Sequence, residues 1–286
     1  MDKLLDCVVI GGGPAGLSAS INLVNRNKDI LLLSLSTNYL KKAQRVDNYL
    51  GFYNISGTDL MNKFLEHAEK MNVNIKYGRV LNIYKFEDYF MVNFQNEIIK
   101  TKSIILALGI VKNVLIENED TFLGKGVSYC ATCDGMLYKN KTVAITGNSS
   151  DIVNEANFLK SIGCKVYFVS TIKPDDLDQN IEFVNGVIKK INGNLKIENI
   201  VLNTGKVIDI DGLFILRNAI SANTLLKDLK IENGIIDTNR NLETNIKGVY
   251  ACGDCTGEPF QISKAVGEGL ISALNCVKYI DNLKEV

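Results

Sequence analysis

The sequence lacks several features that would each point to a particular chemistry. It has no tryptophan, only three prolines and a single histidine, His67, among 286 residues. A mechanism that depends on a histidine relay would therefore have to use His67. That residue falls in the segment 59–68, whose apolar spacing predicts an amphipathic helix, and we expect it on the solvated face.

The chain also lacks an excess of charge and a long apolar run. Its 32 basic and 32 acidic side chains cancel, which argues against a nucleic-acid partner because phosphate binding needs a basic excess. No apolar run approaches the roughly 20 residues that span a bilayer, so no membrane partner is expected. The first residues pass directly into a strand and a glycine turn, which leaves no room for a signal peptide and predicts a cytoplasmic location.

A dinucleotide-binding fingerprint is present near the N-terminus. An apolar strand over 4–10 leads into Gly11, Gly13 and Gly16, spaced as G-x-G-x-x-G, and a helix follows. These glycines permit a tight turn, close approach of a pyrophosphate, and close packing of helix on strand. The next strand ends at Ser34, where an acidic ribose ligand is the usual residue, so the ribose would be held by Ser34 or by backbone.

The segment 141–169 repeats the strand–turn–helix–strand pattern without its chemistry. Ser149 and Ile152 replace glycines of the fingerprint, and Asp151 puts a negative charge where a pyrophosphate would bind. The second strand of this repeat leads into 170–176, which has two acids and no arginine for a 2′-phosphate. This predicts a second dinucleotide-type domain that does not bind a nicotinamide.

Cysteine spacing supplies the most specific chemical signal. Cys130 and Cys133 form a C-x-x-C pair followed by Asp134, a pattern typical of redox chemistry in a reducing compartment. Cys252 and Cys255 form another such pair, and all four could in principle bind zinc or iron. Because the second pair ends a buried strand, we expect no metal site. The other three cysteines lie in apolar stretches and are expected in the core: Cys7, Cys164 and Cys276.

These motifs together resemble the low-molecular-weight thioredoxin reductases, two-domain flavoproteins, over nearly the whole chain. The resemblance implies an α/β fold with two Rossmann-like, three-layer ββα domains, the second inserted into the first. The FAD domain would comprise 1–112 and 242–286, and the disulfide domain 113–241. The implied FAD contacts are Gly11, Gly13, Pro14, Ala15, Gly16, Ser34, Asn48, the Val80 backbone, Gly253, Asp254, Phe260 (in place of the usual arginine), Gln261 and Ile262.

This chain lacks the nicotinamide-binding motifs, and in this respect it resembles the ferredoxin-dependent flavin thioredoxin reductases. That resemblance implies FAD as cofactor, reduced ferredoxin as electron donor, thioredoxin as acceptor, and a homodimer. In a C-x-x-C pair that opens a helix, the first thiol is the more exposed one, so Cys130 is the predicted attacking thiol and Cys133 faces the flavin. Asp134 is the predicted proton donor and acceptor, because cleaving a disulfide requires protonation of a leaving thiolate.

Two alternatives remain open from the sequence. One is an NAD(P)H-dependent disulfide reductase with an unusual nucleotide site. The other is a flavin-bearing redox sensor that is not an enzyme. Lys41, Lys42 and Arg45 are candidates for a ferredoxin docking surface, with a solvated charge run as the competing interpretation.

Overall fold

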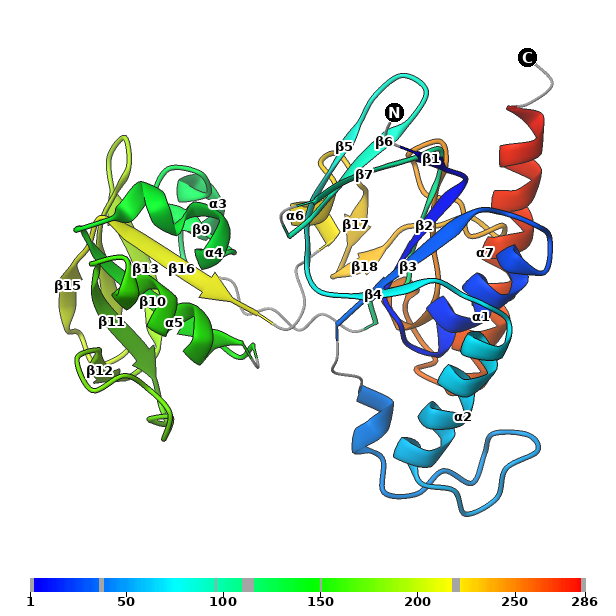
Figure 1. Cartoon of the computed structure of the whole chain (residues 1–286), viewed down its shortest axis with the longest axis horizontal. Helices are drawn as coiled ribbons and strands as arrows, with labels where there is room; N and C mark the ends of the chain where they lie inside the picture. The colour runs from blue at the N-terminus through cyan, green and yellow to red at the C-terminus, as the bar shows by residue number, and fades with distance from the viewer. Residues whose placement is uncertain are drawn as a thin grey trace. The chain divides into compact units, whose positions relative to one another are not determined.

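The computed structural model describes residues 3–35, 39–95, 97–109, 116–149, 151–217 and 222–283. The chain divides into two compact units, one formed by Met1–Lys112 with Ala219–Val286 and the other by Asn113–Asn218 (Figure 1). The second unit is therefore inserted into the first. No helix in these described segments is both long enough and apolar enough to cross a membrane.

The first unit has three layers around a parallel five-stranded sheet. In the order β19-β8-β2-β3-β4, its strands are Val249–Ala251, Ile104–Leu106, Cys7–Ile10, Ile30–Ser34 and Ile75–Tyr77. One face packs on helices α1 (Pro14–Val24), α2 (Gly57–Lys70) and α7 (Ile262–Asn282). The other packs on a second sheet of β1 (Leu4–Leu5), β7 (Glu97–Thr101), β6 (Phe90–Phe94) and β5 (Val80–Lys85). The unit also contains the short elements η1 (Tyr39–Lys42), α6 (Ala222–Leu225), β17 (Ile231–Glu232), β18 (Ile235–Ile236) and η3 (Gly253–Thr256).

Strand β2 shows why this arrangement buries an apolar run completely. Cys7 and Val9 point into the core shared with the helices, while Val8 and Ile10 point into the core shared with the second sheet. A central strand that is covered on both faces needs apolar residues at every position. The single strand expected over 4–10 is divided at Asp6, whose carboxylate accepts the Asp29 N–H at 3.0 Å.

The second unit repeats the same three layers. Its parallel sheet has the order β12-β11-β10-β16-β9, formed by Glu182–Asn185, Lys165–Ser170, Thr142–Gly147, Gly212–Leu216 and Val127–Ser128. One face packs on α4 (Ala131–Asp134), η2 (Gly135–Tyr138) and α5 (Ile152–Ser161). The other face packs on an antiparallel sheet of β13 (Ile188–Gly193), β14 (Ile197–Leu202) and β15 (Val207–Asp209). The short helix α3 (Glu119–Phe122) follows soon after the chain enters this unit. The predicted fold class is thus confirmed.

The second boundary of the inserted unit lies earlier than the sequence suggested. We expected residues up to 241 in that unit, but the described residues from Ala222 onward group with the first unit. The physical reason is apolar packing: Leu225 and Leu226 after the crossing are buried in the core that contains Ile83 of β5, and Leu226 forms a bridge with Ile83.

Candidate functional site

The glycine fingerprint connects β2 to α1 in a turn that excludes side chains. Gly11 has φ +114°, and a Cβ there would lie 2.1 Å from the Ala107 carbonyl oxygen. A Cβ at Gly16 would lie 1.8 Å from the Gly11 carbonyl oxygen, so the helix packs against the turn itself. Gly13 is the N-cap of α1 and Pro14 its first residue, so the N-cap residue has no side chain that could bond the N–H groups of the first turn. This geometry suits the pyrophosphate of a dinucleotide.

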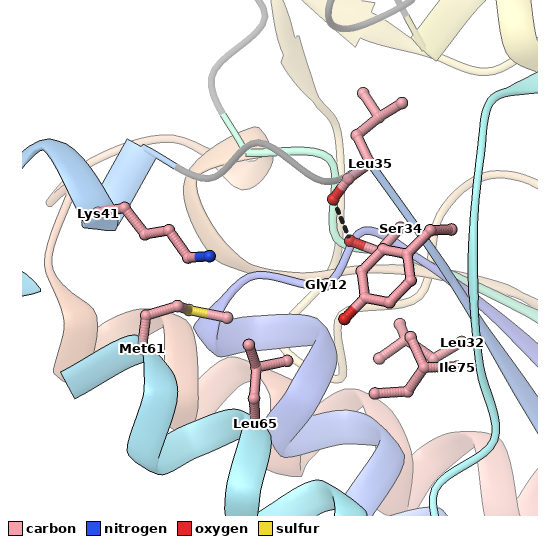
Figure 2. Close-up of a pocket in the computed structure, with 9 residues that line it drawn as sticks. Gly12, Leu32, Ser34, Leu35, Lys41, Met61, Leu65 and Ile75 are labelled. Atoms are coloured by element: carbon pink, nitrogen blue, oxygen red, sulfur yellow. Dashed lines mark hydrogen bonds between the residues drawn. The ribbon is translucent and has the colours of Figure 1, made fainter. Parts of the chain in front are cut away.

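A pocket opens beside this turn at the ends of β3 and β4 (Figure 2). Ser34 lies in it where a ribose would be expected, and its hydroxyl donates to the Leu35 carbonyl at 2.8 Å. The Lys41 side chain extends into the pocket from η1, a position that the sequence had not distinguished from a surface charge run. The lining residues are Gly12, Leu32, Ser34, Leu35, Lys41, Met61, Leu65, Ile75 and Tyr77.

Val80 lies outside this lining. Its side chain is buried in the core of the first unit, at the start of β5. The sequence assigned only its backbone to the adenine end of FAD, which stays a prediction. The residue of this part of the chain that lines the pocket is Tyr77.

A second glycine turn, Gly253–Thr256 (η3), lies against the fingerprint helix. Gly253 has φ +81°, and a Cβ there would lie 2.8 Å from the Ala15 Cβ. The structure therefore brings Ala15 and Asp254, which are 239 positions apart, to the same region. The Asp254 pKa is raised, first by burial, and Glu268 adds to the shift while Lys264 opposes it.

Two charged residues of α7 hold the Gly253–Thr256 turn in place. The Lys264 ammonium donates to the Gly253 carbonyl at 3.0 Å, to the Gly257 carbonyl at 2.7 Å and to the Thr256 hydroxyl at 2.9 Å. The Glu268 carboxylate accepts the Gly253 N–H at 2.8 Å and the Thr256 hydroxyl at 2.7 Å, and it lies 3.2 Å from the Lys264 ammonium. Neither residue was among the predicted site residues, although their i,i+4 spacing on a helix is a recognisable pairing signal.

The two segments assigned to the flavin ring are directly joined. The Asn48 amide donates to the Gln261 side-chain oxygen at 2.8 Å, across 213 positions of sequence. Gln261 is the N-cap of α7 and Ile262 its first residue, and the Phe260 ring before them is 45% exposed. The first unit thus has a side-chain-free glycine turn at a helix N-terminus, a pocket beside Ser34, and a second helix N-terminus joined to the Asn48 segment. These features fit FAD.

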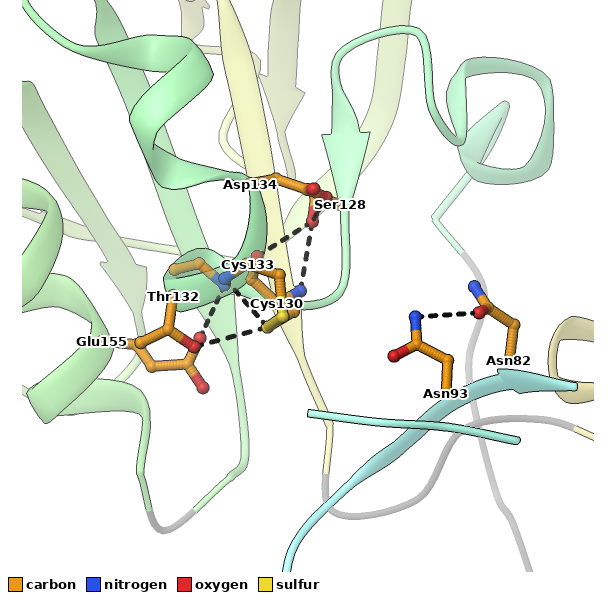
Figure 3. The surroundings of a disulfide bond; sticks show 9 residues. Asn82, Asn93, Ser128, Cys130, Thr132, Cys133, Asp134 and Glu155 are labelled. Atoms are coloured by element: carbon orange, nitrogen blue, oxygen red, sulfur yellow. Dashed lines mark hydrogen bonds between the residues drawn. A yellow bond between two sulfur atoms is a disulfide. The ribbon is translucent and has the colours of Figure 1, made fainter. Parts of the chain in front are cut away.

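The second unit carries the redox pair as a disulfide between Cys130 and Cys133 (Figure 3). Cys130 is the N-cap of α4, and its sulfur accepts the Cys133 N–H at 3.2 Å. The Thr132 hydroxyl lies 3.4 Å from the same sulfur. Hydrogen bonds donated to a sulfur at a helix start stabilise its thiolate form, as expected of an attacking thiol.

Asp134 is held by Ser128, which was not among the predicted site residues. The Ser128 hydroxyl donates to the Asp134 carboxylate at 2.7 Å and accepts the Cys130 N–H at 3.1 Å. On a different side of the disulfide, the Glu155 carboxylate accepts the Ala131 N–H at 2.7 Å (Figure 3). The disulfide segment is therefore held by two carboxylates of its own unit. Asp134 of α4 acts through Ser128 of β9, and Glu155 of α5 bonds the backbone directly.

The glycine turn of the second unit uses its backbone donors internally. The N–H groups of Asn148 and Ser149 both donate to the Leu216 carbonyl, at 2.9 and 3.1 Å. A Cβ at Gly147 would lie 1.8 Å from that same carbonyl oxygen, so the remaining glycine serves close packing against β16. Asp151 is the N-cap of α5, which places its carboxylate at the helix start as the sequence predicted. A pyrophosphate would have to displace these bonds and overcome that charge.

The remaining thiols are buried in the cores. Cys7, Cys164, Cys252, Cys255 and Cys276 are free and buried, as expected for the core cysteines. Burial raises the pKa of the Cys255 thiol to about 11. Within the described residues, no three histidine, cysteine or acidic side chains gather as metal ligands. His67 is exposed on α2, in agreement with the expected solvated position.

Comparison with known proteins places this architecture in a family. Residues 5–269 match the model of the pyridine nucleotide-disulphide oxidoreductases. A thioredoxin reductase of Mycoplasma genitalium is 32% identical, with 95% of this chain and 94% of the relative covered. A thioredoxin reductase of Bacillus subtilis is 29% identical, with 99% and 97% covered. The crystal structure of a ferredoxin-flavin thioredoxin reductase from Clostridium acetobutylicum is 40% identical and superposes with a TM-score of 0.93, with 99% of this chain and 100% of that chain covered.

The family match agrees with the geometry on two points, the FAD cofactor and the redox disulfide. Members of the family are FAD-binding flavoproteins, which confirms the expected cofactor. The disulfide and the FAD-compatible site are the two redox centres that such an enzyme needs. The chain therefore belongs to the pyridine nucleotide-disulphide oxidoreductases, among their thioredoxin reductases.

Proposed function

We propose that the protein is an FAD-dependent thioredoxin reductase that takes its electrons from reduced ferredoxin rather than from NADPH. The observation that carries this proposal is the glycine turn of the second unit, whose Asn148 and Ser149 N–H groups donate to the Leu216 carbonyl. A nicotinamide dinucleotide would need those donors for its pyrophosphate. The 40% identity to a ferredoxin-flavin thioredoxin reductase supports the same donor.

The chemistry that FAD supplies when bound is to accept electrons singly and to release them as a pair. Two electrons and two protons convert the Cys130–Cys133 disulfide into two thiols. The Cys130 thiolate then attacks the thioredoxin disulfide, and the sulfur that leaves takes up a proton, for which Asp134 is our candidate donor. Attack by Cys133 on the mixed disulfide releases reduced thioredoxin and restores the enzyme disulfide.

The energetics allow this donor without a nicotinamide. A plant-type ferredoxin has a potential of about −400 mV and a thioredoxin about −270 mV. Transfer of two electrons across this difference of about 130 mV releases about 6 kcal/mol. The acceptor is therefore almost completely reduced at equilibrium.

Anaerobic flavin absorbance distinguishes the possible donors. The purified yellow protein receives NADPH, then NADH, then reduced ferredoxin, with thioredoxin present throughout, and dithionite serves as the control for a reducible flavin. We expect bleaching and thioredoxin thiols only after ferredoxin. Rapid bleaching by NADPH would favour the NAD(P)H-dependent alternative and sink the proposal, and ferredoxin-driven bleaching without thioredoxin thiols would favour the redox sensor.

The family resemblance also motivates a homodimer in the cytoplasm as part of this proposal. Light scattering of the FAD-loaded protein at micromolar concentration tests the dimer. A mass equal to one chain of 31.6 kDa would contradict it.

A further inference from the structure

Glu119 is a buried carboxylate in the second unit that the chemistry at the disulfide does not use. Its side chain is 1% exposed and is paired with the Arg217 guanidinium through both oxygens. It also accepts the Tyr129 hydroxyl at 2.8 Å and the Ile116 N–H at 3.0 Å. Burial alone raises the Glu119 pKa, but the hydrogen bonds and charge of Arg217 with the other donors outweigh it, and the pKa is lowered. A buried charge persists only when it is paired and bonded in this way.

The partners of Glu119 come from three separate places in the chain. Ile116 is the first described residue after the chain enters the second unit. Arg217 directly follows β16 and is the last described residue before the chain leaves that unit. Tyr129 directly follows β9, which pairs in parallel with β16, and it directly precedes Cys130. One carboxylate therefore joins both chain connections of the inserted unit to the residue before the redox pair.

We propose that Glu119, Arg217 and Tyr129 are positioning residues that fix the Cys130–Cys133 disulfide with respect to the two connections of its unit. These connections are the covalent links to the unit that carries the FAD site. Within the second unit, the cluster holds the residue before Cys130 against the first and last described residues of that unit, which limits the orientation of the disulfide, and a misplacement of about 1 Å can cost about a hundredfold in rate. The inference rests on disulfide reduction by a flavin, which the family establishes, and is independent of the electron donor.

The test separates positioning from simple stabilisation. Arg217→Met leaves the Glu119 charge buried and unpaired, so it lowers stability whatever the role. The double variant Glu119→Leu/Arg217→Met removes both charges and is expected to recover much of the thermal midpoint. If the cluster positions the disulfide, this double variant still transfers electrons about tenfold or more slowly than the wild type. If the cluster only stabilises the fold, the rate returns with the midpoint.

The rate is measured without any natural donor. Enzyme reduced by dithionite, with the excess removed, is mixed with oxidised thioredoxin, and the return of flavin absorbance is followed as thioredoxin concentration is raised. The electron pair then passes through the Cys130–Cys133 disulfide to the thioredoxin disulfide, which takes up two protons. We expect a lower maximal rate with FAD content unchanged and a half-saturating thioredoxin concentration within about twofold of wild type, because the substituted Arg217 and Glu119 side chains are only 14% and 1% exposed.

Two further variants complete the design. Lys190→Met breaks the solvent-exposed Lys190–Glu117 ion pair in the same unit and should leave the maximal rate within about twofold of wild type. Tyr129→Phe removes a single hydroxyl from the cluster and covers the case in which the double variant does not fold. We expect it to slow the reaction by about threefold or more, with a smaller loss of thermal midpoint than in Arg217→Met, because the Glu119 carboxylate loses one hydrogen bond but keeps its ion pair. A wild-type rate in Tyr129→Phe, or in a folded double variant, overturns the proposal, as does an equal loss in Lys190→Met.

Discussion

Single residues around the disulfide differentiate two chemically equal sulfurs. The Cys130 sulfur accepts the Cys133 N–H and lies beside the Thr132 hydroxyl, so donors surround the sulfur that would carry the negative charge. Its backbone is fixed on both sides, because Ser128 accepts the Cys130 N–H and Glu155 accepts the N–H of the next residue. These contacts stabilise a thiolate on Cys130, as its predicted role as nucleophile requires.

Substitution of each cysteine tests this assignment. Cys130→Ser should retain FAD and lose thioredoxin reduction, because the attacking thiolate is gone. Cys133→Ser should also lose turnover but accumulate a mixed disulfide with thioredoxin, because Cys130 attacks and nothing resolves the product. Non-reducing electrophoresis distinguishes the two variants. Retained activity in Cys130→Ser, or a mixed disulfide in that variant, would refute the assignment.

Lys41 offers a second residue-scale prediction, because it lines the pocket beside Ser34. An ammonium in this position can bond the ribose or phosphate oxygens of FAD, which would compensate for the missing acidic ribose ligand. We expect Lys41→Met to raise the FAD dissociation constant about threefold to tenfold, with a steeper loss at low salt. Lys42→Met, on the same turn but outside the pocket lining, is the matched control, and equal weakening in both variants would indicate a general charge effect.

At the scale of elements, the glycine turns and strands were predictable because their signals are local. The spacing of Gly11, Gly13 and Gly16 after an apolar strand fixes a βα turn, and the structure has it there. Partners across long distances were not predictable. Glu119 of α3 and Arg217 after β16 are 98 positions apart, and it is the tertiary fold of the second unit that brings them together. The same holds for the bond between Asn48 and Gln261, whose residues were identified only through a family resemblance.

At this scale, the contact between helix α7 and the segment 253–257 can be tested. Lys264 supplies three hydrogen bonds to the segment 253–257, and that turn brings Asp254 to the fingerprint helix. Lys264→Met leaves two backbone carbonyls without this donor at an estimated cost of about 1–3 kcal/mol each, so the turn loosens. We expect FAD to bind at least about tenfold more weakly, which equilibrium titration of the apoprotein by flavin fluorescence measures.

The control for Lys264 lies on the same helix. Lys278 is exposed near the C-terminal end of α7, so Lys278→Met removes an equal charge far along the helix from the turn. Its FAD dissociation constant should match that of the wild type within about twofold. If Lys264→Met binds FAD as tightly as Lys278→Met, the turn does not depend on this ammonium.

At the scale of the whole molecule, two separate sets of apolar cores predict two separable unfolding events. The first unit buries one core on each face of its β2-containing sheet, and the second unit does the same around β10. FAD contacts predicted from the sequence lie in the first unit, so the cofactor should stabilise that unit alone. At a free FAD concentration about 100 times the dissociation constant, the expected gain is about 2.7 kcal/mol. For a unit of this size, that raises the unfolding midpoint by about 5–10 °C.

Differential scanning calorimetry of the intact chain measures this with and without FAD. We expect two transitions, of which only one moves with FAD concentration. Reduction of Cys130–Cys133 should move only the other transition, because the disulfide lies in the second unit. Its effect should be smaller than that of a bridge closing a long loop, because its two cysteines are only three positions apart. The Gly11→Ala variant serves as control, since a Cβ 2.1 Å from the Ala107 carbonyl disrupts the fingerprint turn and should abolish the FAD-dependent shift. A single transition that moves as one with FAD would show that the two units unfold cooperatively, and the assignment of cofactor stabilisation to the first unit alone would then be wrong.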